Sequence, residues 1–174
     1  MNKIFLLFAY LVCTNSTAER ADRNAKAVIT YDGEMTHDSI NGTTHAEGNV
    51  LVKKGSTIIS SDILTIRENP NGFYISEVST WAGRISKFKQ KQDSGVERWL
   101  DAEGRRIEYD EETDVVTIFD RAKIKVSEGA ETMEEANGSR ISYDGRAERY
   151  IVRGSGDVEK PPNSRATLII MLKH

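Results

Sequence analysis

The chain has 174 residues, which is enough for one domain with a substantial hydrophobic core. Hydrophobic residues make up 38% of it and charged residues 29%, a balance that excludes a predominantly membrane-embedded protein. The net charge is −3 and the basic residues form no stripe, which argues against a nucleic-acid-binding protein.

The first eighteen residues have the pattern of a secretory signal peptide. Lys3 gives a positive start, residues 4–13 form an apolar run, and the Ser-Thr-Ala sequence at 16–18 supplies the small residues that a signal peptidase prefers. Ten helical residues reach only about half of a bilayer core, which is too short for an anchor. We therefore expect cleavage after Ala18, export, and one mature domain over residues 19–174 without any cysteine.

Four similar short segments follow one another along the chain. They read VITYD at 28–32, ILTIR at 63–67, RIEYD at 106–110 and RISYD at 140–144. Each alternates apolar and polar residues with period two, which is typical of a half-buried strand. The segments recur every 34 to 43 residues, in the range of repeat architectures.

A second apolar signal follows each segment and predicts a further strand. These signals are AEGNV, WAGRI, DRAKI and SGDV, which end at residues 50, 85, 124 and 158. Turn-forming sequences separate the predicted strands, among them Asp32-Gly33, Asn41-Gly42, residues 69–72, residues 93–95, Asn137-Gly138 and Asp144-Gly145. We expect an all-β protein of about sixteen short antiparallel strands, packed around one continuous apolar interior.

The alternation also predicts which side chains face that interior. The inward set comprises Ile29, Tyr31, Val50, Val52, Leu64, Ile66, Ile107, Tyr109, Ile124, Val126, Ile141, Tyr143, Leu168 and Ile170. On the residues alone, such a set is most simply a packed core. The last predicted strand lies beyond Pro161-Pro162 and contains Thr167, Leu168, Ile169 and Ile170. It either closes the fold as an ordinary strand or pairs with another chain through its edge.

Chemistry-bearing motifs are scarce. His37 and His45, together with Asp38, are candidates for a metal site, but they read more simply as solvated loop residues. The acidic pairs lie in turn-like stretches, and the sequence has neither a phosphate-binding glycine loop nor a nucleophile elbow. We expect no cofactor, no metal and no catalysis. An exported β-solenoid or jelly-roll enzyme acting on polysaccharide stays open as an alternative, as does a structural oligomer with a filled core.

Three stretches, together with the leader, carry a resemblance to a known family. They are AEGNVLVKKGSTIISSDILTI at 46–66, FKQKQDSG at 88–95 and ANGSRISYD at 136–144. In this order the chain resembles the LptA (OstA-like) family of periplasmic lipopolysaccharide export proteins, over about residues 27–172. An LptC-like component of the same system is the nearest alternative. The sequence departs from better-known members in Lys89 and Lys91, and in lacking a long charged tail.

The resemblance implies a twisted β-jellyroll of two antiparallel sheets in an open V, located in the periplasm. It implies that the interior binds the lipid A part of lipopolysaccharide, and that protomers stack head to tail between an LptC-like inner-membrane component and an LptD-like outer-membrane translocon. The family's inward apolar positions match Ile29, Tyr31, Phe88 and Tyr109. The full set that we expect to contact lipid is Ile29, Tyr31, Val50, Val52, Leu64, Ile66, Phe88, Ile107, Tyr109, Ile124, Ile141 and Tyr143, with Thr167, Leu168, Ile169 and Ile170 as the partner edge. The cations Lys87, Lys89, Lys91, Arg105 and Arg106 are expected to be solvated, with lipid phosphates at the rim as a weaker alternative.

Overall fold

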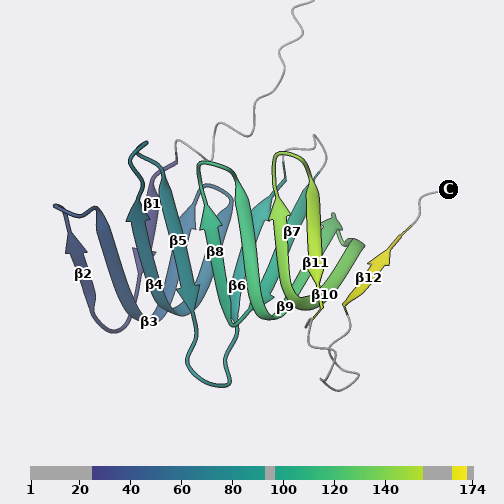
Figure 1. The fold of residues 1–174 in the computed structure, drawn as a ribbon, viewed down its shortest axis with the longest axis horizontal. Helices are drawn as coiled ribbons and strands as arrows, with labels where there is room; N and C mark the ends of the chain where they lie inside the picture. Colours follow the sequence, from purple (N-terminus) through teal and green to yellow (C-terminus); the bar gives the residue numbers. More distant parts are fainter. Residues whose placement is uncertain (1–24, 93–96, 155–165, 172–174) are drawn as a thin grey trace, which may run out of the picture.

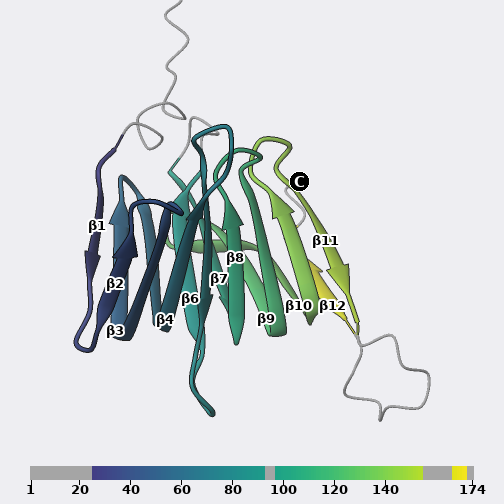
Figure 2. The same cartoon turned by 60° about the vertical axis from the view of Figure 1, so that its left-hand side comes forward.

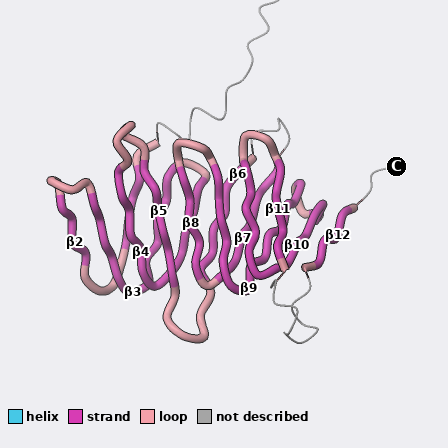
Figure 3. The backbone as a smooth tube through the Cα atoms, viewed as in Figure 1, coloured by secondary structure: helices cyan, strands magenta, loops and turns pink. Residues whose placement is uncertain are grey.

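The computed structural model describes residues 25–92, 97–154 and 166–171, and this part of the chain is built from strands and turns without a helix (Figure 3). The prediction of an all-β protein is confirmed. The predicted signal peptide lies outside the described residues, as does the SGDV segment at 155–158.

Twelve strands are present in the described residues, and Figure 1 shows them side by side from β2 at one end to β12 at the other. Their bounds are β1 Ala27–Thr30, β2 Met35–Asp38, β3 Thr43–Lys54, β4 Thr57–Glu68, β5 Tyr74–Ser79, β6 Ser86–Lys91, β7 Arg98–Gly104, β8 Arg106–Asp110, β9 Val115–Glu128, β10 Glu131–Asp144, β11 Arg149–Arg153 and β12 Thr167–Ile170. All pairings are antiparallel.

Four long strands change partners halfway and fold the sheet into two layers, which Figure 2 shows from the side. The first layer contains β2, β5, β8 and β11 with one half of β3, β4, β9 and β10. The second layer contains β1, β6, β7 and β12 with the other halves. Each layer therefore has eight segments. The sequence predicts about sixteen separate strands, whereas the described residues form twelve, because four long strands each take part in both layers.

The bends are built from residues that tolerate an unusual backbone. In β3 they are Gly48 and Asn49, with φ of 86° and 44°, and in β9 they are Asp120 and Arg121, with φ of 54° and 58°. Positive φ is uncommon outside glycine, asparagine and aspartate, so Arg121 marks a locally forced turn. The register of β3 slips between Glu47 and Val50 at the same place.

These bends correct two sequence predictions. AEGNV and DRAKI do not begin new strands, because each lies where one strand crosses from the first layer to the second. WAGRI is the loop that makes the same crossing between β5 and β6. Asn137-Gly138 is not a hairpin turn either, since it lies inside β10 beside the register shift that bends this strand.

A buried carboxylate holds the crossing loop against the bend of β4. Asp62 is fully buried and accepts a hydrogen bond from the backbone N–H of Trp81 at 3.0 Å. Its Oδ1 lies 2.6 Å from the guanidinium of Arg84 in the same loop. A buried charge is tolerated only with such partners, so this pair fixes where the chain changes layer.

The repeated letters of the sequence have a structural counterpart. RIEYD is β8 and RISYD is the end of β10, and they lie in the same register on the two sides of β9. Ile107 and Ile141 both pair with Ile118, while Tyr109 and Tyr143 both pair with Val116. The repeat thus places one row of aliphatic side chains near the bends and one row that contains the two tyrosines farther from them.

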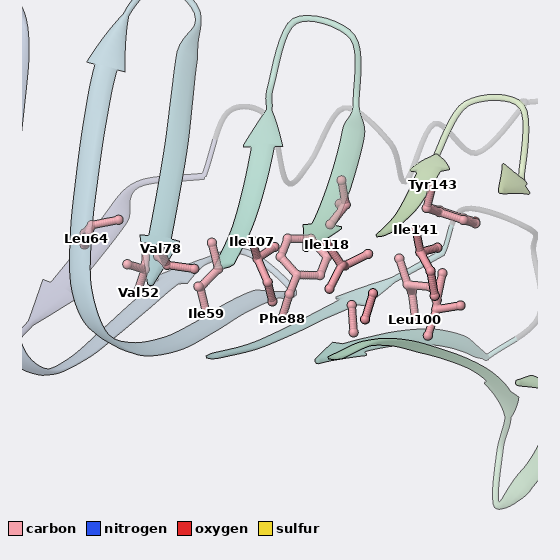
Figure 4. Packing of buried hydrophobic residues seen from close by; sticks show 14 of the residues in the cluster. Val52, Ile59, Leu64, Val78, Phe88, Leu100, Ile107, Ile118, Ile141 and Tyr143 are labelled. Atoms are coloured by element: carbon pink, nitrogen blue, oxygen red, sulfur yellow. The ribbon is translucent and has the colours of Figure 1, made fainter. Parts of the chain in front are cut away.

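The core lies between the two layers. Leu64, Val78, Ile107, Ile118 and Ile141 project from the first layer, and Val52, Ile59, Phe88 and Leu100 from the second (Figure 4). All of these side chains are at most 7% exposed. At about 25 cal/mol per Å² of apolar surface, this burial supplies the main stabilisation of the fold.

Candidate functional site

The interior opens into a cavity of about 650 Å³ near the β1 and β2 end of the molecule. Its apolar walls come from both layers, with Val52 and Ile59 on one side and Ile66, Phe73 and Tyr109 on the other. Val52, Ile66 and Tyr109 belong to the lipid-binding set that the sequence predicts. Cavities of this size and character are usual for apolar ligands.

Most of the other predicted lipid-binding residues are packed in the core. Val50, Leu64, Phe88, Ile107, Ile124 and Ile141 are at most 2% exposed, and Tyr143 is 3% exposed. The Phe88 ring packs on Tyr109 across the two layers, with centroids 5.6 Å apart. Within the described residues, the middle of the interior is therefore closed by side chains, while the cavity stays open near β1.

The two N-terminal members of the set differ from each other. Ile29 is half-buried and packs on the core, opposite Val52. Tyr31 is 38% exposed and is not part of the packed core. The reason is that β1 ends at Thr30, and the following turn at Asp32 is held to the bend of β3 instead of continuing the alternation.

A row of polar side chains runs along the side opposite the bends, where the two layers end; we call this side the lip. Each contact joins one layer to the other. Lys54 of β3 pairs with Glu111 beyond β8, the hydroxyl of Tyr143 donates to Oε1 of Gln92, and Arg98 of β7 lies 3.2 Å from Glu148. These pairs tie the two layers together along the lip, and Lys54 and Glu111 also line the cavity.

Tyrosines strengthen the same row. Besides Tyr143, Tyr109 bonds Gln90 and the Asp114 carboxylate, and Tyr150 bonds Glu134 from the second layer. Burial is the main cause that raises the pKa of Tyr109 and Tyr143 above its usual value, and it raises the pKa of Tyr150 to about 12. These phenols are therefore neutral at physiological pH and act as hydroxyl donors at the lip.

Sequence reasoning missed this polar row although the signal was present. Val50 and Val52 face inwards, so the same alternation puts Lys54 on the inner face; Ile107 and Tyr109 do the same for Glu111. Charged residues usually face solvent, so the alternation alone does not single out an inward lysine or glutamate. The charge of Lys54 is tolerated on the inner face because Glu111 on the opposite layer pairs with it.

The C-terminal end of the sheet presents an apolar edge. β12 pairs with β10, and Leu168 stands opposite Ala136, so the inner face of the second layer continues to the last described strand. Leu168, Ile169 and Ile170 are each at least 50% exposed. The strand is thus the last of its layer, and within the described residues its outer edge has no partner strand and its apolar side chains are exposed, which is the usual setting for pairing with another chain.

The candidate metal ligands are engaged elsewhere. Nδ1 of His37 lies 2.9 Å from Thr44, His45 contacts Thr65 and Glu47, and Asp38 caps the turn at 40–41. The described residues contain no group of three metal-ligating side chains. They also contain no helix with the length and apolar character needed to cross a membrane.

Comparisons with known proteins agree with this geometry. Residues 24–149 match the family model described as LptA/(LptD N-terminal domain) LPS transport protein. The crystal structure of LptH, the LptA homologous periplasmic component of the conserved lipopolysaccharide transport device from Pseudomonas aeruginosa, has a similar fold, with a TM-score of 0.69 and 23% identity. The match covers 87% of this chain and 99% of that one. Among curated proteins there is no significant match.

Proposed function

The chain belongs to the LptA/(LptD N-terminal domain) family of LPS transport proteins, and from this premise we propose that it carries lipopolysaccharide through the periplasm with the lipid A acyl chains between its two layers. The description of the family as transport proteins agrees with the prediction that the chain is not an enzyme. The observation that carries the proposal is one inner apolar face that runs from Ile29 at the β1 end to Leu168 on β12.

The physical need for such a face follows from the ligand. Each methylene group removed from water is worth about 0.8 kcal/mol, so an exposed twelve-carbon chain costs on the order of 10 kcal/mol. A carrier that crosses an aqueous space must cover the chains at every step and still release them. A trough with an accessible side does both, whereas a closed pocket of high affinity retains its ligand.

Loading requires the layers to part. The 650 Å³ cavity has room for a drug-sized ligand, and further chains need the space that Phe88, Leu100 and Ile118 occupy. The contacts at the lip are non-covalent polar pairs across the layers, which other hydrogen-bonding or charged groups can replace. At the bends the backbone itself joins the two layers, so the bends act as the hinge and the lip is the side that opens.

We further propose head-to-tail stacking through the two ends of the sheet. In the part of the chain that the structure describes, β12 has an unpaired edge at one end, and β1 and β2 have unpaired edges at the other, where Val28 is 57% and Met35 is 41% exposed. Backbone hydrogen bonds supply affinity in such strand addition, and the side chains set the register. An LptC-like component and an LptD-like translocon are the expected partners at the two ends.

Photocrosslinking tests the carrier function. A photoreactive residue at position 109, which lines the cavity, is expected to form adducts with lipid A in cells. The same residue at position 108 is the matched control, because Glu108 is the neighbour on the opposite face of β8. Adducts at both positions, or at neither, would contradict an interior lipid site and favour a permanently filled core.

A further inference from the structure

Two cations stand on the inner face of the trough, at the lip. In β3, Lys54 follows the inward Val50 and Val52 with period two, and in β7, Arg98 precedes the inward Leu100 with the same period. Their side chains are only 23% and 27% exposed. Placing a charge beside an apolar interior is costly, so two such residues call for a partner of opposite charge.

Each cation has a partner in the opposite layer, and Arg98 also lies 3.8 Å from Glu128 of the adjacent β9 in its own layer. Lys54 pairs with Glu111 and Arg98 with Glu148, and both glutamates lie in turns at the ends of first-layer strands. When the layers part, Lys54 moves away from Glu111 and Arg98 moves away from Glu148, while Arg98 keeps Glu128 of its own layer. Glu111 and Glu148 then hydrate on their turns, whereas Lys54 and Arg98 stay beside the apolar wall.

Arg98 is incompletely satisfied even with the lip closed. Its Nε is buried and has no hydrogen-bond acceptor among the described residues, although its terminal nitrogens lie near Glu128 and Glu148. An unpaired buried donor is rare in folded proteins, and the Arg98 Nε can take an acceptor from outside the described residues. Guanidinium groups bind phosphate particularly well, through two parallel hydrogen bonds.

We propose that Lys54 and Arg98 bind the phosphate groups on the head group of the acylated ligand, in place of Glu111 and Glu148. This inference rests on the proposed function, since acyl chains between the layers bring a head group to the lip. A phosphate monoester carries more negative charge than a carboxylate and has three acceptor oxygens, so the exchange favours the ligand. Tyr109 lines the same cavity as Lys54.

Other lysines do not have this property. Lys87 pairs with Glu103, and Lys89 with Asp101, from β6 to the adjacent β7. Both partners belong to the second layer, so these pairs persist whether the lip is open or closed. They are therefore not released to a head group, and Lys87→Gln serves as the matched control for a lost lysine charge.

The test is displacement of a bound fluorescent fatty acid from the purified protein by three competitors. These are bisphosphorylated lipid A, the same lipid without phosphates, and inorganic phosphate. We expect the wild type to bind the phosphorylated lipid about tenfold more tightly than the lipid without phosphates, because one or two charge-assisted hydrogen bonds provide a difference of this size. Lys54→Gln and Arg98→Gln should each remove most of this preference, and Lys87→Gln should leave it unchanged.

Glu111→Gln separates the proposal from a purely structural ion pair. Because Glu111 competes with the phosphate for Lys54, its neutralisation should increase the preference several-fold, opposite in sign to Lys54→Gln. Equal effects of the two variants, or no effect of either, would overturn the head-group assignment. If millimolar inorganic phosphate weakened the binding of both lipids equally, the head-group assignment would be overturned in favour of a free-phosphate site. Failure of both lipids to displace the probe from the wild type would refute the carrier function itself.

Discussion

Replacing Phe88 by alanine tests how firmly the middle of the interior is packed. The Phe88 side chain is 1% exposed and lies between the layers against the ring of Tyr109. Truncating a buried phenylalanine to alanine costs about 3–5 kcal/mol, which combines lost transfer free energy with the cavity left behind. The aromatic pair contributes about 1 kcal/mol of this. We expect a loss of about 4 kcal/mol in the free energy of unfolding.

Urea unfolding followed by circular dichroism measures this loss, with the slope of the transition as a check that the unfolded state is unchanged. Phe88→Leu keeps most of the volume and should cost less than about 1.5 kcal/mol. Trp81→Ala is the exposed control, since Trp81 is 51% exposed, and should change stability by about 0.5 kcal/mol or less. A loss below about 1 kcal/mol for Phe88→Ala would refute the reasoning, because it would show that the layers are already apart at Phe88 in solution.

Three further predictions concern the lip, the bends and the edge. The free energy of unfolding should fall as pH rises above about 10. At that pH tyrosine ionises in the unfolded chain, whereas in the folded chain the pKa of Tyr150 is about 12 and those of Tyr109 and Tyr143 are raised. In an alkaline titration Tyr143→Phe should reduce this fall, and the same dependence of stability on pH in both proteins would contradict the burial argument. Gly138→Ala should cost about 2 kcal/mol in urea unfolding, because a Cβ there would lie 2.6 Å from the carbonyl oxygen of Arg153. Gly83→Ala meets no atom within 4 Å and should cost about 1 kcal/mol through its φ of 88° alone, so equal costs would count against the clash. Removing residues 165–174 should abolish self-association in sedimentation experiments and change stability by about 1 kcal/mol or less, because the side chains of β12 are exposed; unchanged association would exclude this edge as the contact.

The all-β class, the strands and most of their inner faces follow from the sequence, because period-two alternation is a local property of the chain. The residues Ile107, Tyr109, Ile141 and Tyr143 are inward for this reason, and the repeated pentapeptides occupy equivalent places beside β9. The family resemblance, which depends on the order of such segments, was likewise confirmed by the match over residues 24–149.

Which layer each half-strand joins was decided only in three dimensions. AEGNV and DRAKI read as strand starts, but positive φ at Asn49 and Arg121 turns them into bends, and no local pattern announces that one strand will serve two layers. The same is true of the lip. Lys54 and Glu111 are 57 residues apart, and each alone reads as an ordinary surface charge. Lys54 can stay on an apolar inner face because the opposite layer supplies its counter-charge, and that pairing exists only after the sheet has folded over.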